Sequence, residues 1–82
     1  MSNRRWIVHS GKDFGRAVAD IRHIRARTQT DLSAEVGLGQ PWLAKLENGR
    51  TSPVLEHLLR LLRRLGATVT ITISEPEKRD AP

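Results

Sequence analysis

Residues 10–66 carry a start and a stop signal for each of four short helices, and this punctuation restricts the chain to a small helical domain. Ser10, Thr28 and Ser52 each offer a side-chain oxygen that can accept the unpaired amides of a first helical turn. Gly37 can adopt the left-handed conformation that ends a helix. The signals predict helices over residues 11–27, 29–36, 40–48 and 53–65, with Pro41 and Pro53 in the first turn of the last two.

Length and residue types exclude several classes of protein. An 82-residue chain has room for one domain. The absence of cysteine excludes disulfide scaffolds and cysteine-ligated zinc sites, and no apolar run approaches the roughly 20 residues of a membrane span. The three histidines lack metal-ligand spacing, and no glycine-rich phosphate loop is present. We therefore expect a soluble, cytoplasmic protein without a membrane span, metal, cofactor or enzymatic activity.

Residues 67–74 alternate apolar and hydroxyl side chains, which predicts a β-strand with one wet face. A lone strand leaves its backbone groups unpaired. The favoured solution is a homodimer in which residues 67–74 pair antiparallel with their copy. Pairing with Trp6–Val8 of the same chain is the alternative, and both pairings can occur together. The predicted dimer interface comprises Leu59, Val69, Ile71 and Ile73.

The remaining segments flank these elements. Residues 1–9 are expected to form an N-terminal arm, disordered in solution, with Trp6 clamping it and Arg4 and Arg5 able to reach a minor groove. The full division is an arm over residues 1–9, a DNA-binding domain over 10–66, a dimerisation strand over 67–74 and a flexible tail over 75–82.

The charge balance points to a polyanionic partner. Lysine and arginine total 14 against 9 acidic residues, which gives a net charge of +5. A basic small domain is typical of nucleic-acid binding.

Residues 29–48 have the pattern of a helix-turn-helix. Two short helices flank Gly37, and Ser33 is small enough to let them cross closely. The apolar positions predicted to form their shared core are Leu32, Val36, Leu38, Leu43 and Leu46.

Burial of Leu43 and Leu46 turns the opposite side of the third helix outward. Glutamine can bond an adenine edge and lysine a guanine edge, while small apolar groups contact thymine methyls. The predicted base-contacting residues are Gln40, Pro41, Ala44 and Lys45. The predicted phosphate-contacting residues are Gln29, Trp42, Asn48, Arg50 and Thr51.

Arg22 and Glu47 are interpreted as a structural pair. Each lies beside an apolar core position, so a partly buried ion pair between them is expected to join the first and third helices. Removing one partner of such a pair costs about 3–5 kcal/mol.

The motifs Thr28-Gln29, Gly37-Leu38 and Leu46-Glu47-Asn48-Gly49-Arg50 resemble the Xre/Cro-type helix-turn-helix family of bacterial and phage repressors in order and spacing. A domain that ends directly in a strand is similar to the HipB-type antitoxins. The resemblance implies a mostly α, four-helix, lambda-repressor-like domain whose C-terminal strand forms an intersubunit antiparallel sheet. It also implies double-stranded palindromic operator DNA as ligand, repression of the protein's own operon, and a HipA-like serine/threonine kinase toxin as partner.

The sequence departs from the family pattern at four positions. Ser33 replaces the usual alanine, Ala26 replaces a common turn glycine, and Gly39 replaces the usual hydroxyl cap of the third helix. Pro41 cannot make the polar base contact that some relatives make at this position. Two other functions stay open. One is a stand-alone Xre-family or phage-type regulator without a toxin. The other, from a different class, is a basic module that binds protein or RNA.

Overall fold

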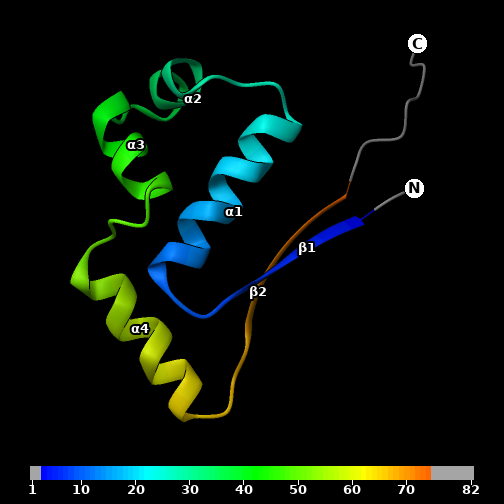
Figure 1. Cartoon of the computed structure of the whole chain (residues 1–82), viewed down its shortest axis with the longest axis vertical. Coiled ribbons are helices and arrows are strands. Elements are labelled where there is room, and N and C mark those ends of the chain that lie inside the picture. The colour runs from blue at the N-terminus through cyan, green and yellow to red at the C-terminus, as the bar shows by residue number, and fades with distance from the viewer. Residues whose placement is uncertain (1–2, 75–82) are drawn as a thin grey trace.

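The computed structural model describes residues 3–74, in which four helices lie beside a two-stranded sheet (Figure 1). The molecule is flat, with extents of 47 × 30 × 16 Å. The expected tail, residues 75–82, lies outside the described residues. The elements are β1 (Asn3–Val8), α1 (Gly11–Ile24), α2 (Gln29–Val36), α3 (Gln40–Glu47), α4 (Pro53–Arg64) and β2 (Val69–Ser74).

The predicted helix starts are confirmed. The hydroxyls of Ser10, Thr28 and Ser52 accept hydrogen bonds from main-chain amides of the first turns of α1, α2 and α4. Asp13 completes the start of α1, since its carboxylate accepts from the amide of His9 at 2.8 Å. Gly39 precedes α3 and supplies no side-chain cap, as its missing side chain requires.

The first helix ends three residues earlier than predicted, at Ile24. Ala26 adopts a left-handed conformation, with φ of 56°. The amide of Arg27 then bonds the carbonyl of Arg22 at 3.0 Å, which closes the helix end in the way a glycine normally allows. Gly37 ends α2 with φ of 76°, as predicted.

The strand finds its partner within the chain. β1 and β2 pair antiparallel, with Trp6 opposite Ile71 and Val8 opposite Val69. The expectation of a disordered arm is therefore wrong for residues 3–8, because their backbone groups satisfy those of β2. Within residues 3–74 each strand is paired along one edge only, and an intersubunit sheet stays a prediction.

Trp6 fastens this sheet to the helices. Its indole nitrogen donates to the Asp20 carboxylate on α1 at 2.9 Å, in keeping with the predicted clamp. The apolar residues of β2 are half-buried while its Thr and Ser residues are exposed, as the alternation predicted.

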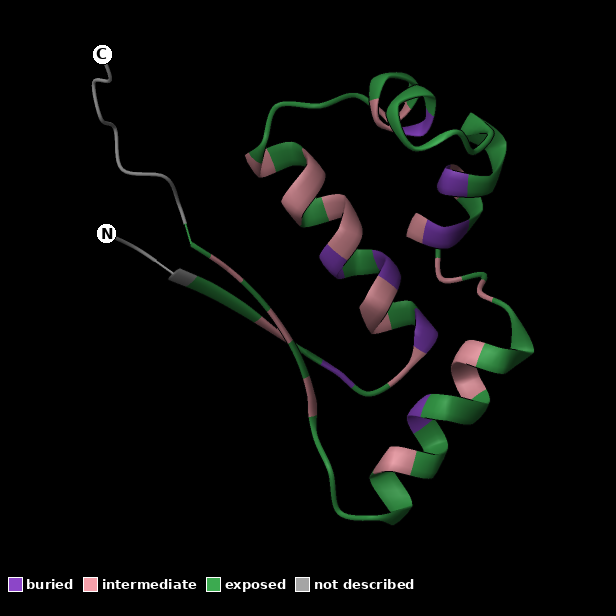
Figure 2. Ribbon diagram, turned by 180° about the vertical axis from the view of Figure 1, so that it is seen from behind, coloured by how far each residue is buried: buried purple, intermediate pink, exposed green. Residues whose placement is uncertain are grey.

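The core lies where α1 meets α3, α4 and β1 (Figure 2). Leu59 is only 5% exposed, so it lies in the core of its own chain rather than at the expected dimer interface. The wide apolar face of α4 allowed either assignment, and the chain buries the side that contains Leu59. The buried apolar residues are Val8, Ala17, Leu43, Leu46 and Leu59.

Two predicted core positions of the helix-turn-helix are exposed instead. Val36 is 56% and Leu38 45% exposed. Helix α2 packs mainly on α3, and this contact leaves Val36 at its end and Leu38 in the turn largely open to solvent. Ser33, by contrast, is buried as expected, and its hydroxyl donates to the carbonyl of Thr30 at 3.1 Å. Among residues 3–74, no helix has the length and apolar character needed to cross a bilayer.

Candidate nucleic-acid interface

Helix α3 is held with one side in the core and the other side open. Leu43 and Leu46 are buried, three positions apart. Gln40, Pro41 and Lys45 are exposed. The side chains predicted to face a ligand therefore point outward, with Ala44 half-buried beside them.

Gly15 sets how closely α3 approaches α1. A Cβ at this position would lie 1.9 Å from the carbonyl oxygen of Leu46, far closer than two non-bonded atoms can approach. The last turn of α3 therefore rests directly on the backbone of α1. Gly15 was not predicted from the sequence, although a glycine inside a helix costs about 1 kcal/mol and so signals a packing demand.

Arg22 and Glu47 form the predicted pair between α1 and α3. Arg22 Nε lies 2.7 Å from Glu47 Oε2 and Nη2 lies 2.9 Å from Oε1, so the contact is bidentate. Both side chains are largely buried. The hydrogen bond from Arg22 lowers the pKa of Glu47, and the same bond raises the pKa of Arg22. The ion pair is thereby kept charged on both sides.

A chain of side-chain hydrogen bonds runs from this pair to the exposed end of α3. Gln29 Nε2 donates to Glu47 Oε1 at 3.0 Å, and Gln40 Nε2 donates to Gln29 Oε1 at 2.6 Å. The direction of the chain follows from chemistry, because an ionised carboxylate only accepts hydrogen bonds. Gln29 must then turn its oxygen toward Gln40. Gln40 keeps one N–H and its own carbonyl oxygen for a ligand, the donor and acceptor that an adenine edge requires.

The predicted phosphate contacts fall into two groups. Trp42, Asn48 and Arg50 are exposed at α3 and just after it, and Trp42 and Arg50 border a hollow of about 220 Å³ between α3 and α4. Gln29 lies at the first position of α2, half-buried, with its side chain engaged as described.

Thr51, the remaining residue of the predicted phosphate contacts, has a hydrogen-bond partner within the chain. Its hydroxyl donates to Glu56 Oε2 at 2.9 Å, and the same oxygen accepts from the amide of Gly11. This hydroxyl proton is therefore used to fasten α4 to the start of α1. Glu56 has a structural role that the sequence analysis missed, because its partners are 5 and 45 residues away in sequence.

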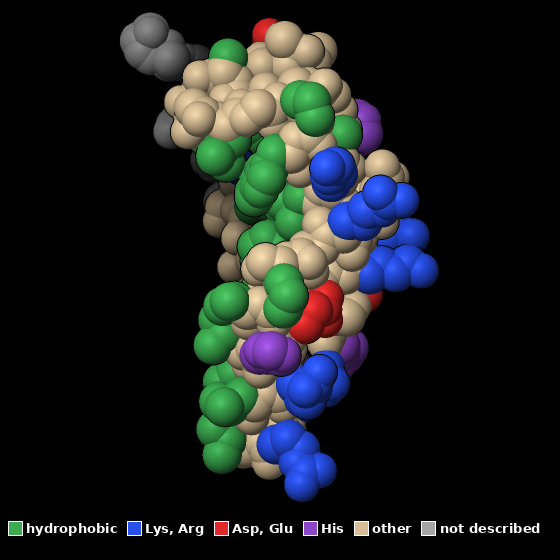
Figure 3. Space-filling model, turned by 90° about the vertical axis from the view of Figure 1, so that its left-hand side faces the viewer, with side chains coloured by type: hydrophobic (Ala, Val, Ile, Leu, Met, Phe, Trp, Pro, Cys, Tyr) green, Lys and Arg blue, Asp and Glu red, His purple; other side chains and the backbone are tan. Residues whose placement is uncertain are grey.

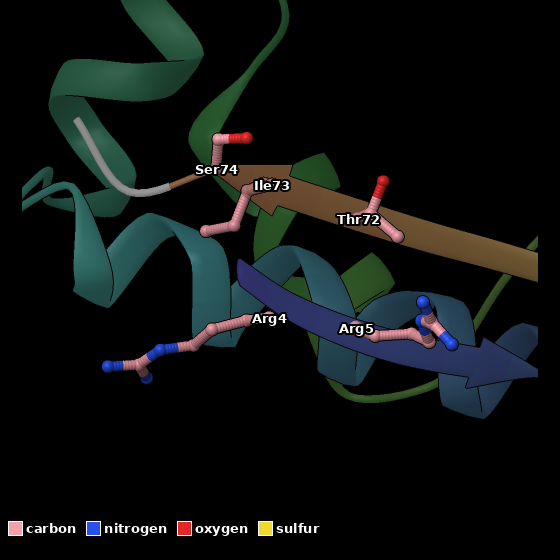
Figure 4. Close-up of a pocket in the computed structure, with 5 residues that line it drawn as sticks. All are labelled: Arg4, Arg5, Thr72, Ile73 and Ser74. Carbon is pink, nitrogen blue, oxygen red and sulfur yellow. The ribbon is translucent and has the colours of Figure 1, made fainter. Parts of the chain in front are cut away.

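The basic residues of β1 lie apart from α3. Helix α1 separates the sheet from α2 and α3 (Figures 1 and 2). Arg4 and Arg5 line a surface hollow of about 590 Å³ at the open end of the two strands, where their side chains leave β1 in different directions (Figure 4). Their place in a paired strand removes the free arm through which they could have reached a minor groove.

On one side of the molecule, the basic and the hydrophobic side chains lie along opposite edges. Figure 3 shows basic side chains along one edge and hydrophobic side chains along the other. The exposed basic residues of α3, its following loop and α4 include Lys45, Arg50, Arg60 and Arg64. No cluster of three or more His, Cys, Asp or Glu side chains suited to a metal occurs in the described part of the chain.

Comparison with known proteins gives the family. A family model described as a helix-turn-helix domain matches residues 13–70, which is more than half of the chain. An uncharacterised HTH-type transcriptional regulator of Haemophilus influenzae is 46% identical over 44 residues, covering 54% of this chain and 45% of the relative. The chain thus spans less than half the length of that relative, and no solved structure matches significantly. The matched region includes α2, α3 and the whole hydrogen-bonded chain from Arg22 to Gln40, and the protein belongs to the helix-turn-helix domain family.

Proposed function

We propose that this protein is a sequence-specific, DNA-binding transcriptional repressor rather than an enzyme. The observation that carries the proposal is the position of Gln40, which is exposed on α3 and oriented by Gln29. A polar side chain held in one orientation on a protruding helix is what base recognition in a major groove requires. The name of the Haemophilus influenzae relative agrees with this function.

The proposed contacts divide by chemistry. Phosphate contacts hold the helix in place and base contacts read sequence. We assign phosphate contacts to Trp42, Asn48, Arg50 and the N-terminal amides of α2 at Gln29. We assign base contacts to Gln40, Pro41, Ala44 and Lys45.

We further propose that two copies bind a palindromic operator. A twofold dimer with its α3 helices about 34 Å apart fits successive turns of DNA. Pairing between the open edges of β2 in two copies would hold that spacing, with Val69, Ile71 and Ile73 covering the helices.

The finer proposal is a HipB-like antitoxin that represses its own operon and neutralises a HipA-like kinase toxin. This proposal is supported by the position of β2, which follows α4 directly in the chain. A stand-alone regulator is the second candidate, favoured by the relative's description as a transcriptional regulator. Co-purification from the native operon separates them, since only the antitoxin brings down a kinase-like protein encoded next to it.

Selection from random duplexes tests DNA recognition directly. We expect one enriched palindrome that outcompetes random duplex by a factor of about 10³ or more, with affinity that falls steeply as salt rises. Equal affinity for all duplexes, or a preference for single-stranded RNA, would instead support the basic interaction module.

Adjacent prolines test the dimer. Neighbouring residues of an antiparallel strand direct their amides to opposite edges, so of Thr70→Pro and Ile71→Pro only one breaks the pairing with β1. The more stable of the two variants is the one that keeps the pairing with β1, and it is expected to sediment as a monomer. If that variant remains a dimer, the open edge of β2 does not form the interface.

A further inference from the structure

Helix α4 carries two apolar faces, and only one of them is used by the fold. Leu55, Leu59 and Leu62 lie on the face that packs into the chain, where Leu59 is buried and the other two are half-buried. The second face is an unbroken row at helical spacing, here named the α4 stripe. It consists of Val54, Leu58 and Leu61 of α4 and of Leu65, the C-cap residue directly after the helix; they are 64%, 54%, 57% and 72% exposed.

The spacing of the residues in the α4 stripe is too regular for a set of unrelated exposed hydrophobic side chains. Its residues follow each other at steps of four, three and four, so they lie on one line along three turns of helix, roughly 16 Å long. Figure 3 shows hydrophobic side chains in a column over the end of the molecule that α4 occupies. Contiguous apolar surface of this kind marks an interaction site.

The border of the α4 stripe is basic. On a helical wheel His57 and Arg64 flank it directly and Arg60 follows behind them, while the opposite border is the core face of α4. Figure 3 shows histidine and basic side chains next to the hydrophobic column. Glu56, the one acidic residue of α4, points its carboxylate at Gly11 and Thr51 and does not neutralise this border.

This charge pattern selects among possible occupants. In a twofold antiparallel packing of α4 on α4, each flank meets the same flank of the copy. His57, Arg60 and Arg64 would then face their own duplicates with no acidic residue between them. Duplex DNA suits the basic border but offers no apolar surface to cover the leucines. A helix with an apolar face and acidic flanks satisfies both parts of the surface.

We propose that the α4 stripe is a docking surface for an amphipathic helix of another protein, whose apolar face covers the four residues and whose Asp or Glu flank pairs with Arg60 and Arg64. This is the helix-in-groove mode of recognition, read at steps of three and four residues. The surface is separate from the exposed side of α3 and requires no contact with DNA.

Two synthetic helical peptides with identical leucines test the proposal, one with glutamate and one with lysine at the flanking positions. Binding to the full chain is measured by fluorescence anisotropy. We expect the glutamate peptide to bind about tenfold or more tightly than the lysine peptide, as two or three ion pairs replace repulsions. The preference should shrink as salt rises.

Variants assign the binding to the surface. The double variant Leu58→Ser/Leu61→Ser should weaken binding of the glutamate peptide by about tenfold or more. The double variant Arg60→Gln/Arg64→Gln should bind the glutamate and lysine peptides with equal affinity. Lys12→Gln/Arg16→Gln on α1 removes the same charge elsewhere and should preserve the preference for the glutamate peptide. Circular dichroism confirms folding, and because all four α4 positions are exposed, we expect unchanged spectra.

Three results would overturn the proposal. The first is equal or tighter binding of the lysine peptide, and the second is no binding of either peptide at millimolar concentration. The third is a peptide-free chain that sediments as a dimer and becomes monomeric in Leu58→Ser/Leu61→Ser, which would identify a second copy as the occupant. If instead the leucine pair alone proves unfolded, the charge variants and the two peptides still decide the question.

Discussion

The side-chain amide of Gln40 donates to the side-chain oxygen of Gln29 across 2.6 Å. The contact joins the exposed end of α3 to the start of α2, and through Glu47 to the buried charge of Arg22. It ties the orientation of a ligand-facing residue to the electrostatics of the core. A surface glutamine without such a partner samples several rotamers, so the bond reduces what Gln40 must lose in entropy on binding.

The first prediction concerns this coupling. Gln29→Ala should weaken binding to the selected operator and blur the preference at the base pair that Gln40 contacts. In a double-mutant cycle with Gln40→Ala, we expect a coupling energy of about 0.5–3 kcal/mol, measured by titration of labelled duplex. Additive effects of the two substitutions would show that Gln29 and Gln40 act separately.

The second prediction is a pH dependence of stability. The pKa of Glu47 is lowered in the folded chain, chiefly by the hydrogen bond from Arg22. Such a carboxylate stabilises the fold above its unfolded pKa of about 4.3 and loses that contribution as the pH falls through the lower folded value. The free energy of unfolding, measured with urea, should therefore fall below about pH 4. Glu47→Gln should be less stable at neutral pH and show a shallower acid decline, whereas an equally steep decline would place the titrating group elsewhere.

The third prediction concerns the contact between α1 and α3. Gly15→Ala should destabilise the chain by about 1–3 kcal/mol or more, because the obstacle is the main-chain carbonyl of Leu46 and cannot rotate away. Gly39→Ala is the control, since its new Cβ would lie 3.7 Å from Pro41 Cδ, an ordinary van der Waals contact. Chemical denaturation compares the two. Equal losses would show that α1 and α3 can separate without cost.

The fourth prediction uses the left-handed turn after α1. Ala26→Gly should raise the free energy of unfolding by about 0.5–1 kcal/mol, because glycine adopts positive φ without strain. Ala34→Gly, inside α2, should lower it by a similar amount. Opposite signs in the same denaturation assay support the strain at Ala26, and a loss in both variants would contradict it.

Local signals predicted the parts of the fold that depend on neighbouring residues. The caps at Ser10, Thr28 and Ser52 and the left-handed Gly37 fix the helix starts and the central turn through contacts a few residues apart. Arg22 and Glu47 were also found, because each lies beside a core position on a regular helix. Helical periodicity reports such positions reliably.

Contacts distant in sequence were not predicted in the same way. The alternation in β2 predicts a strand but not its partner. Strand β1 has only six residues, so its sequence signal is weak, and pairing with a second copy of β2 was an available solution. The leucines of α4 define a wide apolar face, yet only the packed chain shows that Leu59 is inside and Leu58 outside. Hydrogen bonds between glutamines, such as Gln29 with Gln40, depend on the helix crossing and leave no periodic mark.

The central claim is that the exposed side of α3 reads bases, and a base-by-base affinity matrix on the selected operator tests it most directly. Every base pair of a half-site is replaced in turn, and binding of the wild type is compared with Gln40→Ala and Lys45→Ala. We expect each variant to lose about 1–3 kcal/mol of discrimination at its own one or two base pairs and to keep it elsewhere. The charge-matched control Arg64→Gln should leave the pattern unchanged. Identical matrices for the wild type and both α3 variants would contradict the account.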